Sequence, residues 1–268
     1  MALTLTREIR FGLHENAADS AVSSRAMNGH AANPALVDIA PFLTLRATIA
    51  GAVDPATGMM VNIKEVDKVL RAHAVPVLRE AHYGSRRPAA GIMQELLKRV
   101  RGKFVPHELV RLRLGISPYL AFEIAHKEPD VVELALKFEF SAAHRLHATG
   151  LSDQENMKVF GRCNNPNGHG HNYEVEVVVA GLPDAHSGVV TPVGALQQAV
   201  NAHIIDPFDH KHLNLDCPEF AAQGGLNPTV ENIAMVLFRR LAPHVPAPAK
   251  LAALRVWETP KTMCEYRQ

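Results

Sequence analysis

Hydrophobic and polar residues alternate in two stretches of the second half of the chain. Residues 138–146 (FEFSAAHRL) and 172–181 (NYEVEVVVAG) place apolar side chains at nearly every second position, which is typical of half-buried β-strands. Residues 193–205 repeat apolar positions every three to four residues, which predicts an amphipathic helix. We expect a loop over 206–228, after which Thr229 is a favoured N-cap for a second helix.

That second helix and two further strands complete the pattern. Its apolar stripe consists of Ile233, Val236, Leu237 and Leu241. Residues 251–258 and 263–267 are the last predicted strands. The first half of the chain shows the same order of elements, with helices near 63–78 and 88–100. Strands before and after a pair of helices predict antiparallel sheets with helices packed on one face, which is an α+β fold.

A weak internal repeat relates the two halves. LRATIAG in the first half matches VEVVVAG in the second at an offset of 130 residues, and RLRLGISP matches ALRVWETP at an offset of 142. Chance similarity between ordinary strands is the alternative explanation. The polar stretch 126–130 is suited to a linker. We therefore expect two tandem domains, residues 1–127 and 128–268.

Composition narrows the class of protein. A formal net charge of +1 argues against a nucleic-acid partner, which would favour a basic excess. No apolar run approaches the roughly 18 residues that span a bilayer, and the N-terminal residues resemble no targeting peptide, so no membrane partner is expected. The three cysteines do not make a disulfide framework, so we expect a reducing, cytoplasmic location.

The segment GRCNNPNGHGHNY, residues 161–173, holds the most informative cluster. His169 and His171 are two residues apart at the start of a strand, so their rings should point to one face. His144 lies in the preceding strand, where antiparallel pairing would bring it opposite that pair. Three histidines with an open fourth position are the catalytic form of a zinc site, although a His-x-His pair on a strand is also common as polar surface.

Several further residues could take part in chemistry. Cys163 could be a fourth ligand that closes a structural zinc site, or a thiolate base beside an open one, because a nearby cation lowers the pKa of a thiol. Asp209 and His210 form a pair in which the carboxylate can orient the ring and hold its proton. Glu258 occupies a strand position where alternation predicts at least partial burial, so it needs a ligand or a basic partner.

Together these segments resemble the 6-pyruvoyl-tetrahydropterin synthase family. The matching pieces occur in the family's order over residues 136–266, and they are FEFSAAHRL, VFGRCNNPNGHGHNYEVEVVVAG, IDPFDHKHLN, PTVENIA and VWET. The Cys-x5-His-Gly-His spacing is the most specific element, because the related carboxy-tetrahydropterin synthases typically have a shorter gap. The resemblance implies the tunnelling fold, in which ββααββ units join their sheets across subunits into a barrel.

The resemblance also implies a role for each candidate residue. Three histidines would hold zinc, the cysteine would remove a substrate side-chain proton, and the Asp-His pair would complete the proton relay from a neighbouring subunit. One glutamate would anchor the pterin ring by accepting its N–H groups, and the other would lie near the zinc. The metal ligands would be His144, His169 and His171, the catalytic residues Cys163, Asp209, His210 and Glu258, and the substrate-binding residues Thr229 and Glu231.

The implied activity is a zinc-dependent lyase that converts 7,8-dihydroneopterin triphosphate to 6-pyruvoyl-tetrahydropterin with loss of triphosphate. The alternatives are a 6-carboxy-tetrahydropterin synthase or another pterin side-chain-cleaving enzyme on the same scaffold, and a non-catalytic pterin-binding protein. We expect a homo-oligomer with active sites at subunit interfaces. Pro192 departs from the family pattern, where an acidic or amide residue is usual, which puts the start of the helix at 193 in doubt but not the metal site.

The first half resembles the same fold without the residues of the candidate active site. At the offset of 130 residues, His169 and His171 correspond to Ile39 and Pro41, and Cys163 corresponds to Asn33. We expect this degenerate copy to be a structural partner that supplies strands to the shared sheet. Regulation of the site, or binding of a different ligand, is the alternative.

Overall fold

The computed structural model describes most of the chain as two compact units. The described residues are 3–15, 32–36, 39–85, 87–222 and 224–268. Unit 1 comprises Met1–Ala135 with Gly181–Val190, and unit 2 comprises Leu136–Ala180 with Thr191–Gln268. A compact unit is not by itself an independently folding domain, so the expected boundary between residues 127 and 128 stays a prediction.

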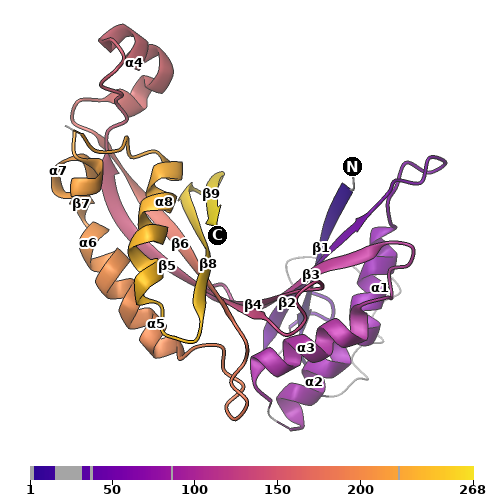
Figure 1. The fold of residues 1–268 in the computed structure, drawn as a ribbon. Helices are drawn as coiled ribbons and strands as arrows, with labels where there is room; N and C mark the ends of the chain where they lie inside the picture. The colour runs from indigo at the N-terminus through magenta and orange to yellow at the C-terminus, as the bar shows by residue number, and fades with distance from the viewer. Residues whose placement is uncertain (1–2, 16–31, 37–38, 86, 223) are drawn as a thin grey trace. The chain divides into compact units, whose positions relative to one another are not determined.

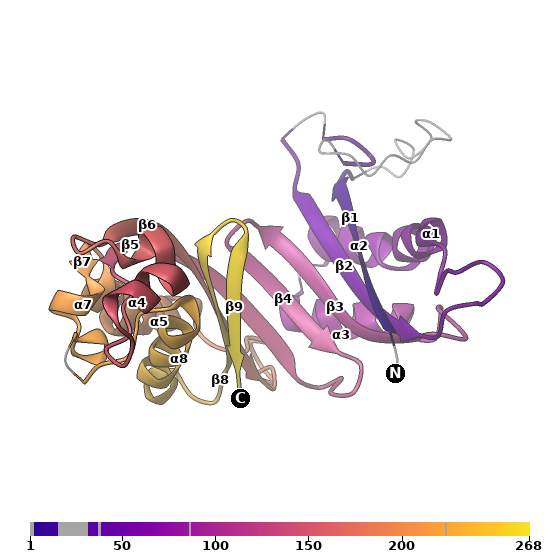
Figure 2. The ribbon, with the colours of Figure 1, turned by 90° about the horizontal axis from the view of Figure 1, so that it is seen from above.

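Unit 1 is an antiparallel sheet with helices on one face. Its strands pair in the order β1-β2-β3-β4. Figure 2 shows the three helices behind these strands. The strands are β1 (Leu3–Gly12), β2 (Phe42–Gly51), β3 (Glu108–Ser117) and β4 (Leu120–Ala125), and the helices are α1 (Ile63–His73), α2 (Val75–Tyr83) and α3 (Ala89–Val100).

The single helix predicted over 63–78 is divided in two at Ala74. Pro76 explains the division, because a proline has no backbone N–H and its ring clashes with the carbonyl four residues earlier. The helix predicted at 88–100 is present as α3.

Unit 2 has the same kind of architecture and carries the candidate site. Its strands are ordered β5-β6-β8-β9, and the short β7 pairs in parallel with β5. Helix α8 packs on β8 and β9, and α4 extends beyond the strands (Figure 1). The strands are β5 (Val132–His144), β6 (His169–Gly181), β7 (Lys211–His212), β8 (Lys250–Thr259) and β9 (Thr262–Arg267), and the longer helices are α4 (Asp153–Phe160), α5 (Val193–Val200) and α8 (Val230–Leu241). Both units are therefore α+β layers, as the sequence predicted.

Two stretches of unit 2 differ from the sequence-based expectation. The helix predicted over 193–205 is α only to Val200, and it continues as a π-helix, η3 (Asn201–Ile205). The loop predicted over 206–228 instead holds short elements, because its apolar side chains turn inward and become buried. Those elements are α6 (Asp206–Phe208), β7, α7 (Leu213–Asp216) and the 3-10 helix η4 (Pro218–Phe220).

Helix α4 was not predicted, although the sequence contains a signal for it. Ser152 and Glu155 form a capping box, in which each side chain bonds the backbone of the other residue. The helix is only eight residues long and buries only Asn156, so it lacks the apolar stripe on which the other helices were recognised.

Helix caps of α5 and α8 bear on the candidate site. The Thr229 hydroxyl accepts from the Asn232 N–H at 3.4 Å, so the predicted N-cap of α8 is present. Helix α5 begins at Val193 as expected, although Pro192 provides no side-chain cap. Within the described parts of the chain, no helix combines the length and apolar character needed to cross a bilayer.

The two units share details that support the tandem hypothesis. An offset of 142 residues carries the bounds of β3 and β4 onto those of β8 and β9. The turn after β2 closes through the Asp54 N–H to the Met59 carbonyl, and the turn after β6 closes through the Asp184 N–H to the Val189 carbonyl. If the two strands resembled each other by chance, the turns after them would have no reason to close in the same way at the same offset.

Candidate functional site

Three histidines converge where β5 ends and the neighbouring β6 begins. His144 is the last residue of β5, and His169 is the first of β6. Alternation along β6 puts His171 on the same face as His169. The ring centroids lie 4.5 Å (His144–His169), 5.1 Å (His144–His171) and 4.8 Å (His169–His171) apart. One ring nitrogen of each residue lies within 4.8 Å of the others, so the three predicted ligands are brought together.

The orientation of the His144 ring is set by the backbone before α8. Its Nδ1 lies 2.8 Å from the carbonyl oxygen of Pro228, and a carbonyl only accepts, so Nδ1 carries the proton. The Nε2 lone pair therefore points at the cluster, 3.1 Å from Nε2 of His169. Histidines that bind metals usually donate their second ring N–H to such an oxygen, which fixes the tautomer.

Electrostatics favour the neutral, metal-binding form of two of these imidazoles, His144 and His169. Burial, together with the neighbouring histidines, lowers the pKa of His144 to about 4 despite the opposing bond to the Pro228 carbonyl. Burial and His171 also lower the pKa of His169. Glu258 Oε1 lies 3.4 Å from His144 Nε2 and 3.7 Å from His171 Nε2. The Glu258 side chain therefore lies directly beside two of the three histidines.

The cluster fits a divalent metal ion. Nε2 of His171 is buried and has no hydrogen-bond partner among the described residues. A buried polar atom without a partner is costly, and a metal ion would satisfy it. The part of the chain that the structure describes contains one group of converging potential ligands, and it consists of His144, His169 and His171 without Cys163. Three imidazole ligands leave the fourth position of a tetrahedral site open.

Cys163 lies in the 3-10 helix η2 (Gly161–Asn164), which is bonded to the backbone just after His144. Its carbonyl accepts from the Leu146 N–H at 2.9 Å, two residues after His144. Burial, followed by the charges of Glu258 and Cys163, raises the pKa of Tyr173. The Tyr173 ring is 5.6 Å from the His171 ring and 6.2 Å from the His144 ring. Tyr173 thus contacts two of the three predicted metal ligands.

The turn between Cys163 and His169 depends on a glycine. Gly168 has φ of +72°, and a Cβ there would lie 2.9 Å from the His144 carbonyl oxygen and 2.7 Å from Nε2 of His212. Left-handed backbone favours glycine, and the His144 carbonyl belongs to the strand that carries the metal ligand.

Gly168→Ala should therefore lower the free energy of unfolding by about 1–3 kcal/mol and weaken metal binding. Denaturant midpoints and metal titrations measure both effects. Gly170→Ala is the matched control, because its Cβ would meet only the Ala142 carbonyl oxygen at 3.7 Å and its φ is not positive. Equal effects of the two substitutions would contradict the role given to Gly168.

The Asp209–His210 pair is held on β5 but not in the metal cluster. Asp209 Oδ1 accepts from the Ser141 N–H at 2.8 Å, and Oδ2 lies 2.8 Å from His210 Nδ1. The bonds from Ser141 and His210 lower the pKa of Asp209. Ser141 lies three residues before His144, which is about 10 Å along a strand. The structure thus brings the pair together but keeps it apart from the three histidines.

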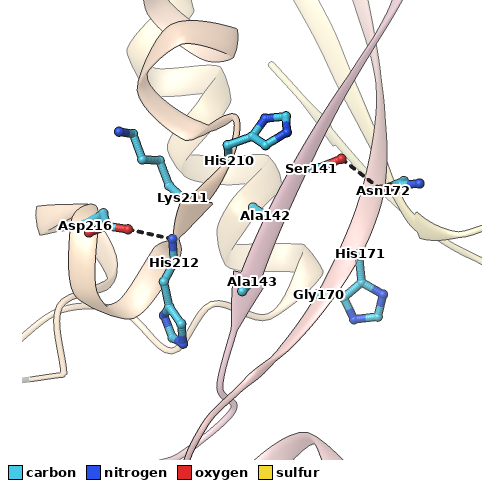
Figure 3. A pocket seen from close by; sticks show the side chains of 10 residues that line it. All are labelled: Ser141, Ala142, Ala143, Gly170, His171, Asn172, His210, Lys211, His212 and Asp216. Atoms are coloured by element: carbon cyan, nitrogen blue, oxygen red, sulfur yellow. Dashed lines mark hydrogen bonds between the residues drawn. The ribbon is translucent and has the colours of Figure 1, made fainter.

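An open cavity of about 640 Å³ is lined by His210 of this pair and also by His171 of the histidine cluster. Figure 3 shows Lys211 and His212 on β7 beside β5, with His210 directly before them, and the bond between Ser141 and Asn172 that links β5 to β6. The His210 side chain is 82% exposed, so it is accessible to a molecule outside the chain.

The predicted substrate-binding residues lie at the start of α8. Thr229 uses its hydroxyl as the helix cap, and Glu231 is exposed in the first turn. Burial, and then the charges of Glu231 and Glu265, raise the pKa of Cys264. Because Pro228 precedes this cap and holds His144, the start of α8 connects the predicted pterin anchor to the metal cluster.

Two residues of the site were missed in the sequence. Tyr173 follows His169 and His171 at the same spacing of two, so alternation along the strand could have placed it on their face. The Pro228 carbonyl left no signal, because every residue has one.

Because His144 is buried in its neutral form, the stability of the metal-free protein should depend on pH. Its pKa of about 4 lies below the ordinary value of 6.5, so the unfolded chain binds more protons as pH falls between these values. Stability should be fully present above pH 6.5 and decline by on the order of 3 kcal/mol toward pH 4. Urea midpoints across this range measure it, with His144→Asn as the reference that lacks the titrating group. Parallel pH profiles of the two proteins would contradict the prediction.

Comparison with known proteins places these residues in a family. The family model described as 6-pyruvoyl tetrahydropterin synthase matches residues 133–268. The human 6-pyruvoyl tetrahydrobiopterin synthase is 40% identical over 135 residues, covering 50% of this chain and 90% of the relative. The protein of the same name from Poecilia reticulata is 44% identical over 128 residues, covering 48% and 84%. A solved 6-pyruvoyl tetrahydropterin synthase from Caenorhabditis elegans has 38% identity and a TM-score of 0.49, covering 52% of this chain and 96% of that one.

Proposed function

The chain belongs to the 6-pyruvoyl tetrahydropterin synthase family, and we propose on that basis that it is a lyase acting on a pterin triphosphate. The reaction converts 7,8-dihydroneopterin triphosphate to 6-pyruvoyl-tetrahydropterin and releases triphosphate. The observation that carries the proposal is the convergence of three histidines within the half of the chain that matches the family.

Zinc is the metal we propose for the cluster, with His144, His169 and His171 as its ligands. Three imidazole nitrogens and an open position suit catalytic zinc. A bound zinc ion would polarise the oxygens of the substrate side chain and thereby acidify the adjacent C–H bonds. The Pro228 carbonyl keeps the His144 lone pair directed at the ion, and burial keeps that ring unprotonated.

Cys163 is the proposed base that takes the side-chain proton. The thiolate is the basic form, and a cation nearby favours it. Because Cys163 is absent from the group of converging ligand atoms, its sulfur stays available for proton transfer in the described structure. Glu258, next to His144 and His171, lies where it can accept a hydrogen bond from a substrate hydroxyl.

Asp209 and His210 are proposed to move protons at a second copy of the site. The Asp209 carboxylate accepts from Nδ1–H of His210, which leaves Nε2 free to exchange a proton. The exposed ring, anchored about 10 Å along β5 from the chain's own histidines, supports an active site at a subunit interface. We propose a homo-oligomer on this basis.

Glu231 is the proposed pterin anchor, and Thr229 positions it by capping α8. An exposed carboxylate in the first helical turn can accept two N–H groups of a pterin ring in a charge-assisted pair. The three free cysteines agree with the expected reducing, cytoplasmic compartment.

Unit 1 is proposed to be a degenerate structural copy. Asn33, Ile39 and Pro41 stand at the offset positions of the thiol and two of the metal ligands, and none of these can replace a thiolate or an imidazole. The matched strand bounds and turns of the two units support common ancestry.

Product analysis tests the proposed reaction. Zinc-loaded protein incubated with 7,8-dihydroneopterin triphosphate should release one triphosphate for each 6-pyruvoyl-tetrahydropterin, both identified by mass. Acetaldehyde with a 6-carboxy-tetrahydropterin would instead identify the carboxy-tetrahydropterin synthase reaction. Tight pterin binding without any turnover would identify a non-catalytic binding protein.

A further inference from the structure

The segment that follows His144 is anchored residue by residue. Its hydrogen bonds reach four separate parts of unit 2, namely the turn before α8, the η2 turn, helix α7 and helix α4. The bonds run from His144 Nδ1 to the Pro228 carbonyl, from the Arg145 N–H to Asn214 Oδ1, from the Leu146 N–H to the Cys163 carbonyl, from the His147 N–H to Asn227 Oδ1 and from the Ala148 N–H to Asn156 Oδ1. These bonds hold the backbone that directly follows the metal ligand His144.

The Arg145 side chain extends this anchoring to the residue after the thiol. Its Nε donates to both the carbonyl oxygen of Asn164 at 3.2 Å and the side-chain Oδ1 of Asn164 at 3.1 Å. Asn164 is only 5% exposed. His147 Nδ1 lies 3.0 Å from the same Oδ1 and supports the arrangement from a second side.

Arg145 is itself fixed at the backbone. Asn214 Oδ1 accepts from the Arg145 N–H at 2.7 Å, and Asn214 Nδ2 donates to the Arg145 carbonyl at 3.1 Å. This two-point contact leaves the backbone of Arg145 little freedom to rotate. The guanidinium therefore connects the end of β5 to the η2 turn that carries Cys163, and the two segments are held at a fixed distance.

We propose that Arg145 is a positioning residue that holds the thiol of Cys163 in register with the metal ligand His144. Cys163 is bonded through its own carbonyl to Leu146, and the next peptide is bonded to Arg145. Both donors directly follow His144 in the sequence. Cys163 and His144 are thus held by the same short segment, and these bonds set the distance between them. The inference rests on the proposed function, because it assigns Cys163 a proton-transfer role.

The charge-retaining substitution Arg145→Lys tests this role. Lysine keeps the positive charge, but its donors are at the end of a flexible stem and not at Nε of a rigid, planar guanidinium, so it cannot hold Asn164 in the same geometry. We expect kcat to fall by about 10²-fold, because displacement of a reacting group by about 1 Å has an effect of that size. KM and zinc stoichiometry should stay unchanged. Arg239→Lys is the matched control, since Arg239 is exposed on α8, and it should keep the parent activity.

A double-mutant cycle separates positioning from general structural damage. If Arg145 acts through the thiol, adding Arg145→Lys to Cys163→Ala should leave the residual rate of the single Cys163→Ala variant unchanged. If Arg145→Lys lowers that residual rate by the same factor as in the parent protein, the inference is wrong. An Arg145→Lys protein with parental kcat would also overturn it.

Alkylation gives a readout that does not depend on turnover. Mass analysis of the Cys163 peptide after iodoacetamide treatment should show modification about tenfold faster in Arg145→Lys, because the released turn opens more often. An unchanged rate would contradict the inference even if the parent protein proved inactive. Absence of turnover in the parent protein would count against the proposed function alone.

Discussion

Replacing Cys163 with serine should lower kcat by about 10²–10⁴-fold, the usual contribution of a positioned acid or base. A serine hydroxyl has nearly the same shape, but its proton is held far more tightly, so the base is lost while the fold is retained. Steady-state turnover and triphosphate release measure the effect. Zinc content should stay at one ion per chain, because Cys163 is not part of the group of converging ligands.

Cys217→Ser provides the control for the thiol substitution. Cys217 is buried, its Sγ lies 3.8 Å from the Pro207 carbonyl, and burial raises its pKa to about 11. A serine there can make the same bond, so kcat should match that of the parent protein. Loss of zinc together with activity in Cys163→Ser would instead identify Cys163 as a fourth ligand of a structural site.

Replacing His171 with alanine should remove the metal and lower kcat/KM by about 10³-fold or more. The estimate follows from the several kcal/mol that a metal ion contributes to charge stabilisation, at about 1.4 kcal/mol for each factor of ten. Only two of the three proposed protein ligands would remain, whereas catalytic zinc sites use three. Metal analysis after dialysis and turnover at saturating zinc are the measurements.

His186→Ala is the control for the metal-ligand substitution. His186 is exposed in the turn after β6 and lies outside the cluster of converging ligands. The His186→Ala variant should retain both bound zinc and the parental turnover. Full activity of His171→Ala without bound zinc would rule out a metal-dependent reaction at this site.

Local periodicity explains which parts of the site the sequence could predict. The spacing of two between His169 and His171 predicts a shared face on any strand, and Thr229 before an apolar stripe predicts a helix start. These features depend only on neighbouring residues. The position of His144 opposite the pair needed only the assumption that two consecutive strands are neighbours, which is the commonest arrangement.

Long-range contacts explain what the sequence could not predict. Strand β7 has two residues, too few for any alternation, yet its pairing with β5 decides where His210 lies. The Pro228 carbonyl that orients His144 comes from 84 residues away. The Arg145–Asn164 contact joins two polar residues that, in sequence, look like ordinary exposed positions. None of these leaves a periodic pattern.

X-ray absorption at the zinc edge of the loaded protein tests the central claim most directly, because it reports which atoms surround the ion. The account predicts three nitrogen neighbours at about 2.0–2.1 Å and one light exchangeable ligand, with no sulfur. A sulfur neighbour at about 2.3 Å would contradict it, since the thiol proposed as a base would then be a permanent ligand.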